Sequence, residues 1–211
     1  MVRVDTLVKR ETSIPKPLVQ DGDLSIRRMR DDLHDYRLMS GWLTDERGLK
    51  FYEGRDNPYD IARVRRKYGP RARGEDPVVP CILVYSGSPI GYLQYYPVLD
   101  RNEYGVDAVE DVYAIDLFIG EPGLWDQGIG TRALSLFVDY LFRTTDAVRI
   151  LIDPQTWNRR AIRCYEKCGF RKIKVLRKHE LHEGEYRDCW LMAIDRILSK
   201  EKTGPGSACQ G

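Results

Sequence analysis

One carboxylate and one pair of glycines lie close together in this sequence and could form part of a binding site for a phosphorylated ligand. Asp116 interrupts the apolar, β-prone run Val112–Ile119, and a charge inside a buried strand costs free energy unless it is paired or used. Gly128 and Gly130 begin an apolar pattern with helical spacing. Glycines at a helix start let the backbone approach a ligand, and the free N–H groups there favour a phosphate. The spacing therefore predicts a phosphate-binding turn just after a strand that carries a reactive acid.

Two common nucleotide-binding motifs differ from this turn. A P-loop requires Lys directly after its last glycine, but Thr131 follows Gly130, so the P-loop is excluded. A dinucleotide fingerprint requires a third small residue, where Ala133 stands, and this exclusion is incomplete because Ala is tolerated there. A structural alternative stays open, in which the glycines only provide space at the start of the helix and Asp116 is paired with backbone groups or an Arg.

A longer motif resembles a known family. The run Asn158–Phe170 has the pattern N-x-x-A-I-x-x-Y-E-K-x-G-F. With the strand, glycine pair and helix before it, this run resembles the acetyl-CoA core of the GCN5-related N-acetyltransferases (GNAT). Further stretches resemble the aminoglycoside 6'-N-acetyltransferases: Trp42–Arg47, Phe51–Asp56, Pro89–Gln94, Ile115–Pro122 and His179–Gly184. The resemblance covers roughly Leu24–Asp195 and departs from the superfamily at Trp125, where Gln or Arg is usual.

The resemblance implies a catalytic role for two side chains. Asp116 is expected to hold and aim the acceptor amine, or to take its proton directly or through water. Tyr165 is expected to protonate the departing thiolate or to hydrogen-bond the sulfur, although a core tyrosine is the alternative. Asn158 lies seven residues before Tyr165, two helical turns away, so both share one helix face. Asn158 is therefore expected to bind the cofactor arm as well as to cap its helix.

The resemblance also implies how acetyl-CoA, the expected cosubstrate, is held. The pantetheine arm is expected to lie along the exposed backbone of Leu117, Phe118 and Ile119 like an added strand. A backbone N–H near Leu117 or Phe118 would then donate to the oxyanion. The diphosphate is expected on the N–H groups of Gln127, Gly128, Ile129, Gly130, Thr131 and Arg132, where the Arg132 side chain could add a charge contact.

Acidic residues gather where the acceptor is expected, and a pocket of this charge suits a polycation. They are Asp107, Glu110, Asp111, Asp116, Asp153, Glu180 and Glu183. Gln94, Asp116 and Asp153 match positions that contact the aminoglycoside in related enzymes, and Asp111 and Glu180 complete the expected acceptor site. The expected function is acetyl transfer to the 6'-amine of an aminoglycoside, which confers antibiotic resistance. The alternatives are another acceptor, such as a siderophore hydroxylysine, a polyamine or a protein N-terminus, and a non-catalytic sensor.

Composition limits the remaining classes. The chain has 211 residues, 42% of them hydrophobic and 31% charged, with a net charge of +2. This balance does not favour a nucleic-acid partner, and no run of about 18 apolar residues predicts a membrane span. Five Cys and three His lack metal-ligand spacing, so we expect no metal. The N-terminus lacks the apolar core of a signal peptide, so we expect a cytoplasmic protein with reduced thiols, as a monomer or homodimer.

The hydrophobic pattern predicts one α/β (α+β) domain over residues 23–198, between flexible segments 1–22 and 199–211. Strands are expected at 24–29, 80–85, 90–98, 112–119, 148–152, 170–178 and 187–197. Helices are expected from Asp31 or Asp32 to about Leu43, and at 59–68, 128–143 and 159–168, with loops at 44–57 and 69–79. The resemblance implies the GNAT fold: a twisted, mostly antiparallel sheet with a splayed central parallel pair and helices on both faces.

Overall fold

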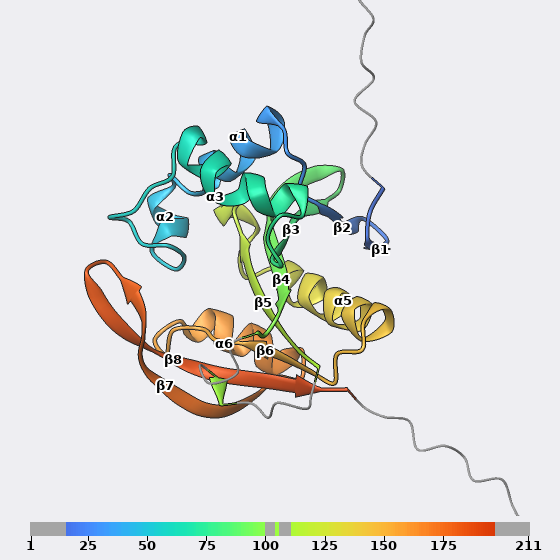
Figure 1. Cartoon of the computed structure of the whole chain (residues 1–211), viewed down its shortest axis with the longest axis vertical. Coiled ribbons are helices and arrows are strands. Elements are labelled where there is room, and N and C mark those ends of the chain that lie inside the picture. Colours follow the sequence, from blue (N-terminus) through green and yellow to red (C-terminus); the bar gives the residue numbers. More distant parts are fainter. Residues whose placement is uncertain (1–15, 100–103, 106–110, 197–211) are drawn as a thin grey trace, which may run out of the picture.

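A computed structural model describes residues 16–99, 104–105 and 111–196 of the chain. Its centre is an eight-stranded sheet with the strand order β1-β2-β3-β4-β5-β6-β8-β7 (Figure 1). The strands are β1 (Val19–Asp21), β2 (Leu24–Arg28), β3 (Val79–Tyr85), β4 (Ser88–Pro97), β5 (Val112–Ile119), β6 (Arg149–Ile152), β7 (Arg171–His182) and β8 (Glu185–Asp195). The helices are α1 (Leu33–Trp42), α2 (Glu46–Leu49), α3 (Ile61–Arg73), α5 (Ile129–Thr144) and α6 (Arg159–Lys167).

The parallel pair β5–β6 separates along its length. The two strands are paired only from Val112 opposite Arg149 to Ala114 opposite Leu151. Beyond this point β5 continues to Ile119 and remains paired with β4 alone. The expected splayed parallel pair in a mostly antiparallel sheet is therefore confirmed. One edge of β5 is left facing a gap.

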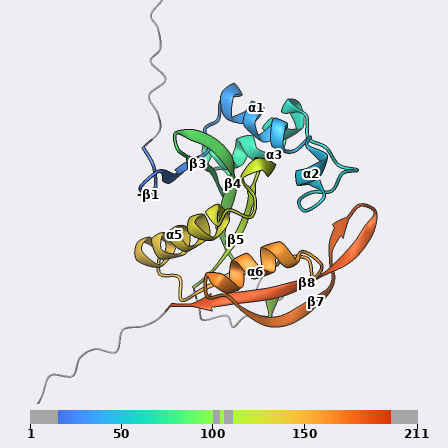
Figure 2. The same ribbon diagram turned by 180° about the vertical axis from the view of Figure 1, so that it is seen from behind.

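Alternation of side chains along the strands divides the core between two faces of the sheet. Cys81 and Leu83 of β3 pack in the cluster that includes α5 and α6, whereas Ile82 between them packs with α1 and α3. In Figure 2, α1, α2 and α3 gather at one end of the molecule and the β7–β8 hairpin lies at the other, with α5 and α6 between them. Helices thus cover both faces, as expected, and the gap beside β5 lies among them.

Several elements differ from the sequence prediction. Helix α3 continues through Pro70 to Arg73, because Gly74 in the left-handed conformation (φ 77°) provides its C-cap. Near a C-terminus, Pro removes only one helical hydrogen bond. The predicted loop 44–57 contains α2, which Asp45 caps through a side-chain bond to the Arg47 N–H. Strand β7 extends beyond residue 178 to His182, so the hairpin is longer than predicted.

The predicted N-terminal extension contributes a strand to the domain. β1 pairs antiparallel with β2, with Val19 opposite Ile26, and Gly22 turns the chain between them with a positive φ of 57°. The pattern does not predict this strand because three residues are too few to show a period. Residues 1–15 and the predicted tail 199–211 lie outside the described residues.

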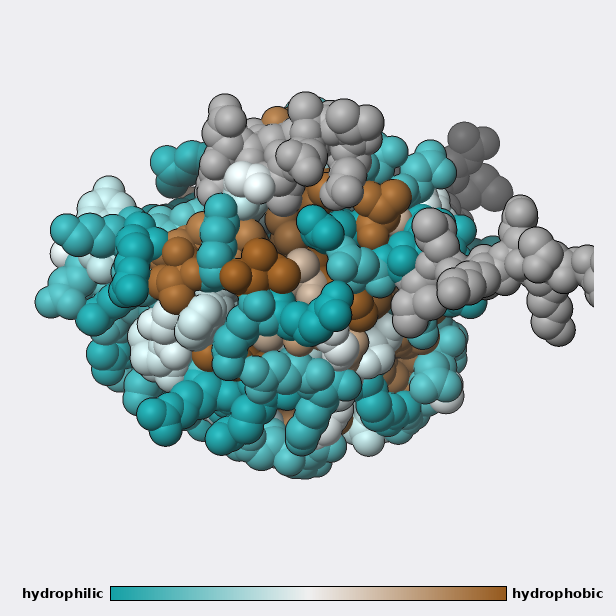
Figure 3. Space-filling view, turned by 90° about the horizontal axis from the view of Figure 1, so that it is seen from below, coloured by the Kyte–Doolittle hydropathy of each residue, from teal (hydrophilic) through white to brown (hydrophobic). Residues whose placement is uncertain are grey.

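The visible surface is mostly hydrophilic. Figure 3 shows one face, on which apolar residues emerge in small patches among hydrophilic ones. Scattered apolar residues of this kind are normal on a protein surface. Within the described part of the chain, none of the helices combines the length and apolarity that crossing a membrane would demand.

Candidate active site

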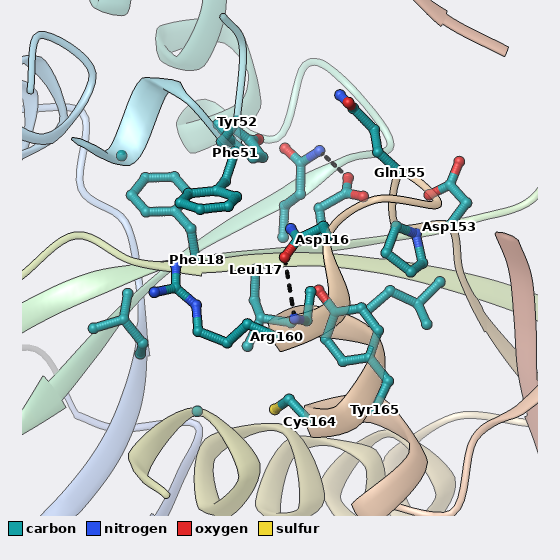
Figure 4. A pocket seen from close by; sticks show the side chains of 18 of the residues that line it. Phe51, Tyr52, Asp116, Leu117, Phe118, Asp153, Gln155, Arg160, Cys164 and Tyr165 are labelled. Carbon is teal, nitrogen blue, oxygen red and sulfur yellow. Dashed lines mark hydrogen bonds between the residues drawn. The ribbon is translucent and has the colours of Figure 1, made fainter. Parts of the chain in front are cut away.

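A cavity of about 640 Å³ opens where β5 and β6 separate, and Figure 4 shows its interior. Strand β5, the turn before α5, the start of α6 and β7 contribute side chains to its wall, together with the segment after α2. The cavity brings together these residues of the predicted site: Gln94, Asp116, Leu117, Phe118, Ile119, Gly128, Ile129, Gly130, Thr131, Asp153, Asn158, Tyr165 and Glu180. Segments far apart in the sequence thus meet in one place.

Asp116 lies on β5 directly opposite Gln94 of β4. The Gln94 amide donates to it, with Nε2 2.6 Å from Asp116 Oδ2, and Figure 4 marks this bond. Burial, and then the charge of Asp153, raise the pKa of Asp116 to about 7, while the hydrogen bond from Gln94 lowers it. A carboxylate with a pKa near neutrality can accept and release a proton at physiological pH.

The orientation of the Gln94 amide is set by two donors on its other side. Arg71 Nη1 lies 2.9 Å from Gln94 Oε1, and the Tyr92 hydroxyl lies 2.8 Å from the same oxygen. Both groups donate, so Oε1 must be the oxygen and the NH2 group must face Asp116. Tyr92 is fully buried and Gln94 is 8% exposed. Gln94 therefore holds Asp116 in place, in addition to its predicted position in the acceptor site.

Two further acids stand beside Asp116. Asp153 follows β6, and its Oδ2 lies 3.0 Å from His179 Nε2. Glu180 on β7 accepts from Gln155 Nε2 at 2.9 Å, and burial raises its pKa. Figure 4 shows Asp116 and Asp153 in the same part of the cavity. This end of the cavity is therefore acidic and partly dehydrated, which suits a cationic acceptor.

The free edge of β5 presents the backbone groups of alternate residues to the gap. Val112 C=O accepts from the Val98 N–H at 2.9 Å, and the Gly120 N–H donates to Ile90 C=O at 2.8 Å. Both bonds point to β4, and backbone groups alternate along a strand, so Leu117 and Ile119 point to the gap whereas Phe118 points to β4. Of the two oxyanion donors suggested by the sequence, the Leu117 N–H is the one directed to the cavity. The Ile119 C=O accepts from Trp125 Nε1 at 2.8 Å.

The glycine turn exposes the first N–H groups of α5. Gly128 is the N-cap with a φ of 79°, a conformation that favours glycine. No side chain caps the helix, and Gly128, Ile129, Gly130 and Thr131 all line the cavity. Such a turn suits an anion such as a diphosphate.

Helix α6 places Asn158 and Tyr165 on the cavity wall, as their spacing predicted. Asn158 Oδ1 accepts from the Ala161 N–H at 3.2 Å, and this bond caps the helix. Tyr165 is 7% exposed, and burial raises its pKa well above the usual value. A phenol with so high a pKa keeps its proton and acts as a hydrogen-bond donor.

Some predicted residues lie away from the cavity wall. Asp111 is exposed before β5, and its carbonyl accepts from the Val148 N–H. Gln127 is exposed and donates to the Gly123 carbonyl. The Arg132 side chain turns to the β1–β2 turn, with Nη2 3.1 Å from Asp23 Oδ1. Each is thus placed outside the cavity, and Asp107 and Glu110 lie outside the described residues.

Sequence reasoning missed several residues of the wall. Arg71 and Arg160 are basic, whereas Phe51 and Trp125 are aromatic, and all four line the cavity. Phe51 belongs to a polar segment, where an aromatic residue is the one local sign of a ligand wall. Arg160 carries no such sign, because a basic residue in a first helical turn is usually solvated.

Acidic and basic side chains predominate at different ends of the cavity, and Arg71 is the cation that reaches the acidic end, where it donates to Gln94. Asp116, Asp153 and Glu180 line one end, whereas Arg160, Arg163 and Lys167 of α6 lie toward the glycine turn. This polarity suits an anionic donor and a cationic acceptor that meet near Asp116. Among the described residues, no group of three or more His, Cys, Asp or Glu could hold a metal ion.

Comparisons with known proteins agree with this geometry. The sequence profile of the acetyltransferase (GNAT) domain matches residues 31–178. Aminoglycoside N(6')-acetyltransferase type 1 of Klebsiella pneumoniae is 31% identical over 141 residues, which are 66% of this chain and 70% of that protein. A kanamycin resistance protein of Rhizobium radiobacter is 38% identical over 76 residues, 36% of this chain and 70% of that protein.

Solved structures show the same relationship. Aminoglycoside acetyltransferase AAC(6')-Ib in complex with coenzyme A superposes with a TM-score of 0.65 at 26% identity, over 82% of this chain and 95% of that one. Its complex with ribostamycin and coenzyme A gives a TM-score of 0.68 at 26% identity, over 83% and 94%. The gap, the glycine turn and the matched profile lead to one conclusion. The chain belongs to the GNAT family of N-acetyltransferases.

Proposed function

We propose that this protein transfers the acetyl group of acetyl-CoA to the 6'-amine of an aminoglycoside, and so inactivates the antibiotic. The observation that carries the proposal is the acidic end of the cavity, where Asp116 has a pKa of about 7 beside Asp153. Relatives support the acceptor, because AAC(6')-Ib is solved with ribostamycin and with kanamycin. Acetyl-CoA supplies an activated acyl group as a thioester.

The chain's own residues suit the binding of such a donor. The N–H groups of the glycine turn are free for a diphosphate. The gap-facing backbone of Leu117 and Ile119 can pair with the amides of a pantetheine arm, as a further strand would. This arrangement would present the thioester carbon to the acidic end of the cavity.

The amine must lose a proton before it attacks. Asp116 is placed to take that proton, because its pKa of about 7 lies near neutrality. Asp153 and Glu180 supply negative charge that attracts the cationic acceptor. A charged carboxylate also stabilises a nearby ammonium. Asp116 therefore first binds and orients the protonated amine, and then accepts its proton.

Bond making and breaking are balanced by three groups. The nitrogen forms a bond to the carbonyl carbon, and the carbon–sulfur bond breaks. The Leu117 N–H is directed to the gap, where it can stabilise the negative charge that develops on the carbonyl oxygen. The Tyr165 hydroxyl donates a hydrogen bond to the departing thiolate, since its raised pKa disfavours full proton transfer. The nitrogen loses two protons between ammonium and amide. The first passes through Asp116 to solvent before the attack, and the second leaves the tetrahedral intermediate through Asp116 and neutralises the departing thiolate.

A thiol-release assay tests the proposal. Purified protein is incubated with acetyl-CoA and a panel of amines, namely kanamycin, ribostamycin, a 6'-hydroxyl aminoglycoside, spermidine and N-hydroxylysine. Thiol release with the 6'-amino compounds and none with the 6'-hydroxyl compound is expected. Release with spermidine or N-hydroxylysine alone would replace the acceptor and keep the chemistry. No release with any amine would reject the proposal.

The proposed location is the cytoplasm. Cys81, Cys164, Cys168 and Cys189 are free thiols, which fits a reducing compartment. The expected oligomeric state, a monomer or homodimer, stays a prediction.

A further inference from the structure

We propose that Arg160 is the side chain that binds the diphosphate of the acetyl donor, reaching it from the far side of the gap. The inference rests on the proposed donor. From the sequence, Arg132 was the side chain that could add a charge contact to the diphosphate, and the structure favours Arg160 for this role. Arg160 is in the first turn of α6, is half-buried and lines the cavity. Four observations support this assignment.

Two aromatic rings hold the guanidinium of Arg160 across the gap. Its Cζ lies 3.9 Å from the ring centroid of Trp125 and 4.7 Å from that of Phe51. The Trp125 ring is itself fixed, because its Nε1 donates to the Ile119 carbonyl. Figure 4 shows the Arg160 side chain extending from α6 across the pocket toward Phe51 and Phe118. The cation is therefore supplied by the β6 side but lies next to the turn that follows β5.

The donors of Arg160 are available to a ligand. A guanidinium that stacks on a ring uses its face and keeps its five N–H groups free in its plane. Among the residues that the structure describes, Arg160 contacts ring faces and forms no hydrogen bond or ion pair. Burial lowers its pKa, with Asp126 opposing that effect. A dehydrated cation with unused donors is stabilised by a bound anion.

The charge of the surroundings selects the ligand. A cationic acceptor is attracted by Asp116, Asp153 and Glu180 and repelled by Arg160. The anionic donor has the opposite preference, and the first-turn N–H groups of α5 favour a phosphate near the same place. The planar guanidinium of an Arg can donate two parallel hydrogen bonds to phosphate oxygens.

Arg132 does not compete for this role. Its guanidinium is paired with Asp23 and approaches Asp21 at 3.7 Å, and its side chain is not part of the cavity wall. A donor would have to break these pairs to recruit it. Trp125 stands where Gln or Arg was expected from the resemblance, and the guanidinium that lies on its ring comes from Arg160.

Binding measurements separate this inference from the proposed function. Titration calorimetry compares coenzyme A with pantetheine, which lacks the phosphates, on the wild type and on Arg160→Gln. Arg159→Gln is the matched control, because Arg159 is the exposed neighbour on the same helix turn. Arg132→Gln tests the alternative cation.

Arg160→Gln is expected to bind coenzyme A about tenfold to hundredfold more weakly, as for loss of a charged hydrogen bond. Its pantetheine affinity should not change, and its coenzyme A affinity should depend less on salt. Arg160→Lys, which keeps the charge without the fork, should fall between. Arg159→Gln and Arg132→Gln should match the wild type.

Equal coenzyme A affinity for Arg160→Gln and the wild type would overturn the inference. An equal loss for both ligands would also overturn it, because pantetheine carries no phosphate. If the wild type itself bound no coenzyme A, the proposed donor would fail instead.

Discussion

The Gln94 amide and the Asp116 carboxylate face each other across the β4–β5 ladder, with Nε2 2.6 Å from Oδ2. This hydrogen bond stabilises the charged form of Asp116, whereas burial favours the protonated, neutral form. Arg71 and Tyr92 fix the amide from behind. The pKa of Asp116 is thus a balance between dehydration and one well-oriented donor, and it can be shifted without touching the carboxylate.

Gln94→Leu should move the pH profile of catalysis to higher pH. The wild-type kcat/KM is expected to rise through about pH 7 as Asp116 ionises. Loss of the amide removes a contact that lowers this pKa, so the rising limb should shift upward. The measurement is kcat/KM against pH, with saturating donor. A uniformly lower profile with an unchanged midpoint would show that Gln94 acts only through the acceptor.

Asp116→Asn should abolish most turnover and leave donor binding intact. Loss of a general base typically reduces the rate by about 10²–10⁴-fold, whereas the proposed diphosphate site is at the glycine turn, away from Asp116. Turnover by thiol release and coenzyme A affinity by calorimetry check the two parts separately. Wild-type turnover in this variant would remove Asp116 from the mechanism.

The same substitution should stabilise the fold at alkaline pH. The folded-state pKa of Asp116, about 7, lies above its ordinary value of 3.8. A raised pKa gives a stabilising contribution that is present below pH 4 and is lost as the pH rises through 7. Asp116→Asn should therefore raise the melting temperature at pH 8 more than at pH 5, by about 2–4 °C for each kcal/mol relieved. An equal change at both pH values would contradict the assigned burial cost.

Much of this site was predictable because local patterns define it. The run at β5 is apolar, β-prone and bounded by turns, and the predicted strand matches Val112–Ile119. The cap at Asn158 and the spacing to Tyr165 also follow from helical geometry. These features depend on neighbours within a few residues, which a sequence displays directly.

Contacts between distant segments were not predictable. Arg132 and Arg160 both lie in first helical turns, and nothing in their neighbours distinguishes them. The difference arises from Asp23, 109 residues before Arg132, and from Phe51 and Trp125, which hold Arg160.

The C-terminal end of α3 could not be predicted from the sequence for the same reason. Gly69 and Pro70 are typical of a helix end, yet the helix continues to Arg73. A Cβ at residue 69 would lie only 3.1 Å from the Tyr36 hydroxyl oxygen. Glycine therefore serves the packing of α3 against α1 at this position, and that contact depends on a residue far away in the sequence.

Glu180→Gln should weaken binding of the acceptor and spare the donor. Glu180 lines the acidic end of the cavity and is held by Gln155, so Gln preserves the shape and removes a charge. A several-fold rise in the KM for kanamycin is expected, corresponding to about 1 kcal/mol, with an unchanged KM for acetyl-CoA. Glu185→Gln, an exposed acid at the start of β8, is the control. An equal effect of both substitutions would indicate only long-range attraction.

Gly91→Ala should destabilise the sheet beside the donor gap. A Cβ at Gly91 would lie 2.3 Å from the Phe118 carbonyl oxygen and 3.0 Å from Ile119 Cα, and backbone atoms cannot yield as a flexible side chain can. The expected loss is about 1–3 kcal/mol in the free energy of unfolding, measured by urea denaturation. Gly41→Ala is the control, because nothing lies within 4 Å of its Cβ position in helix α1, and Ala there should add about 0.5–1 kcal/mol. Since Gly91 is opposite Ile119, the variant should also bind coenzyme A more weakly. Equal stability of the two variants would show that β4 and β5 can separate at this point without loss.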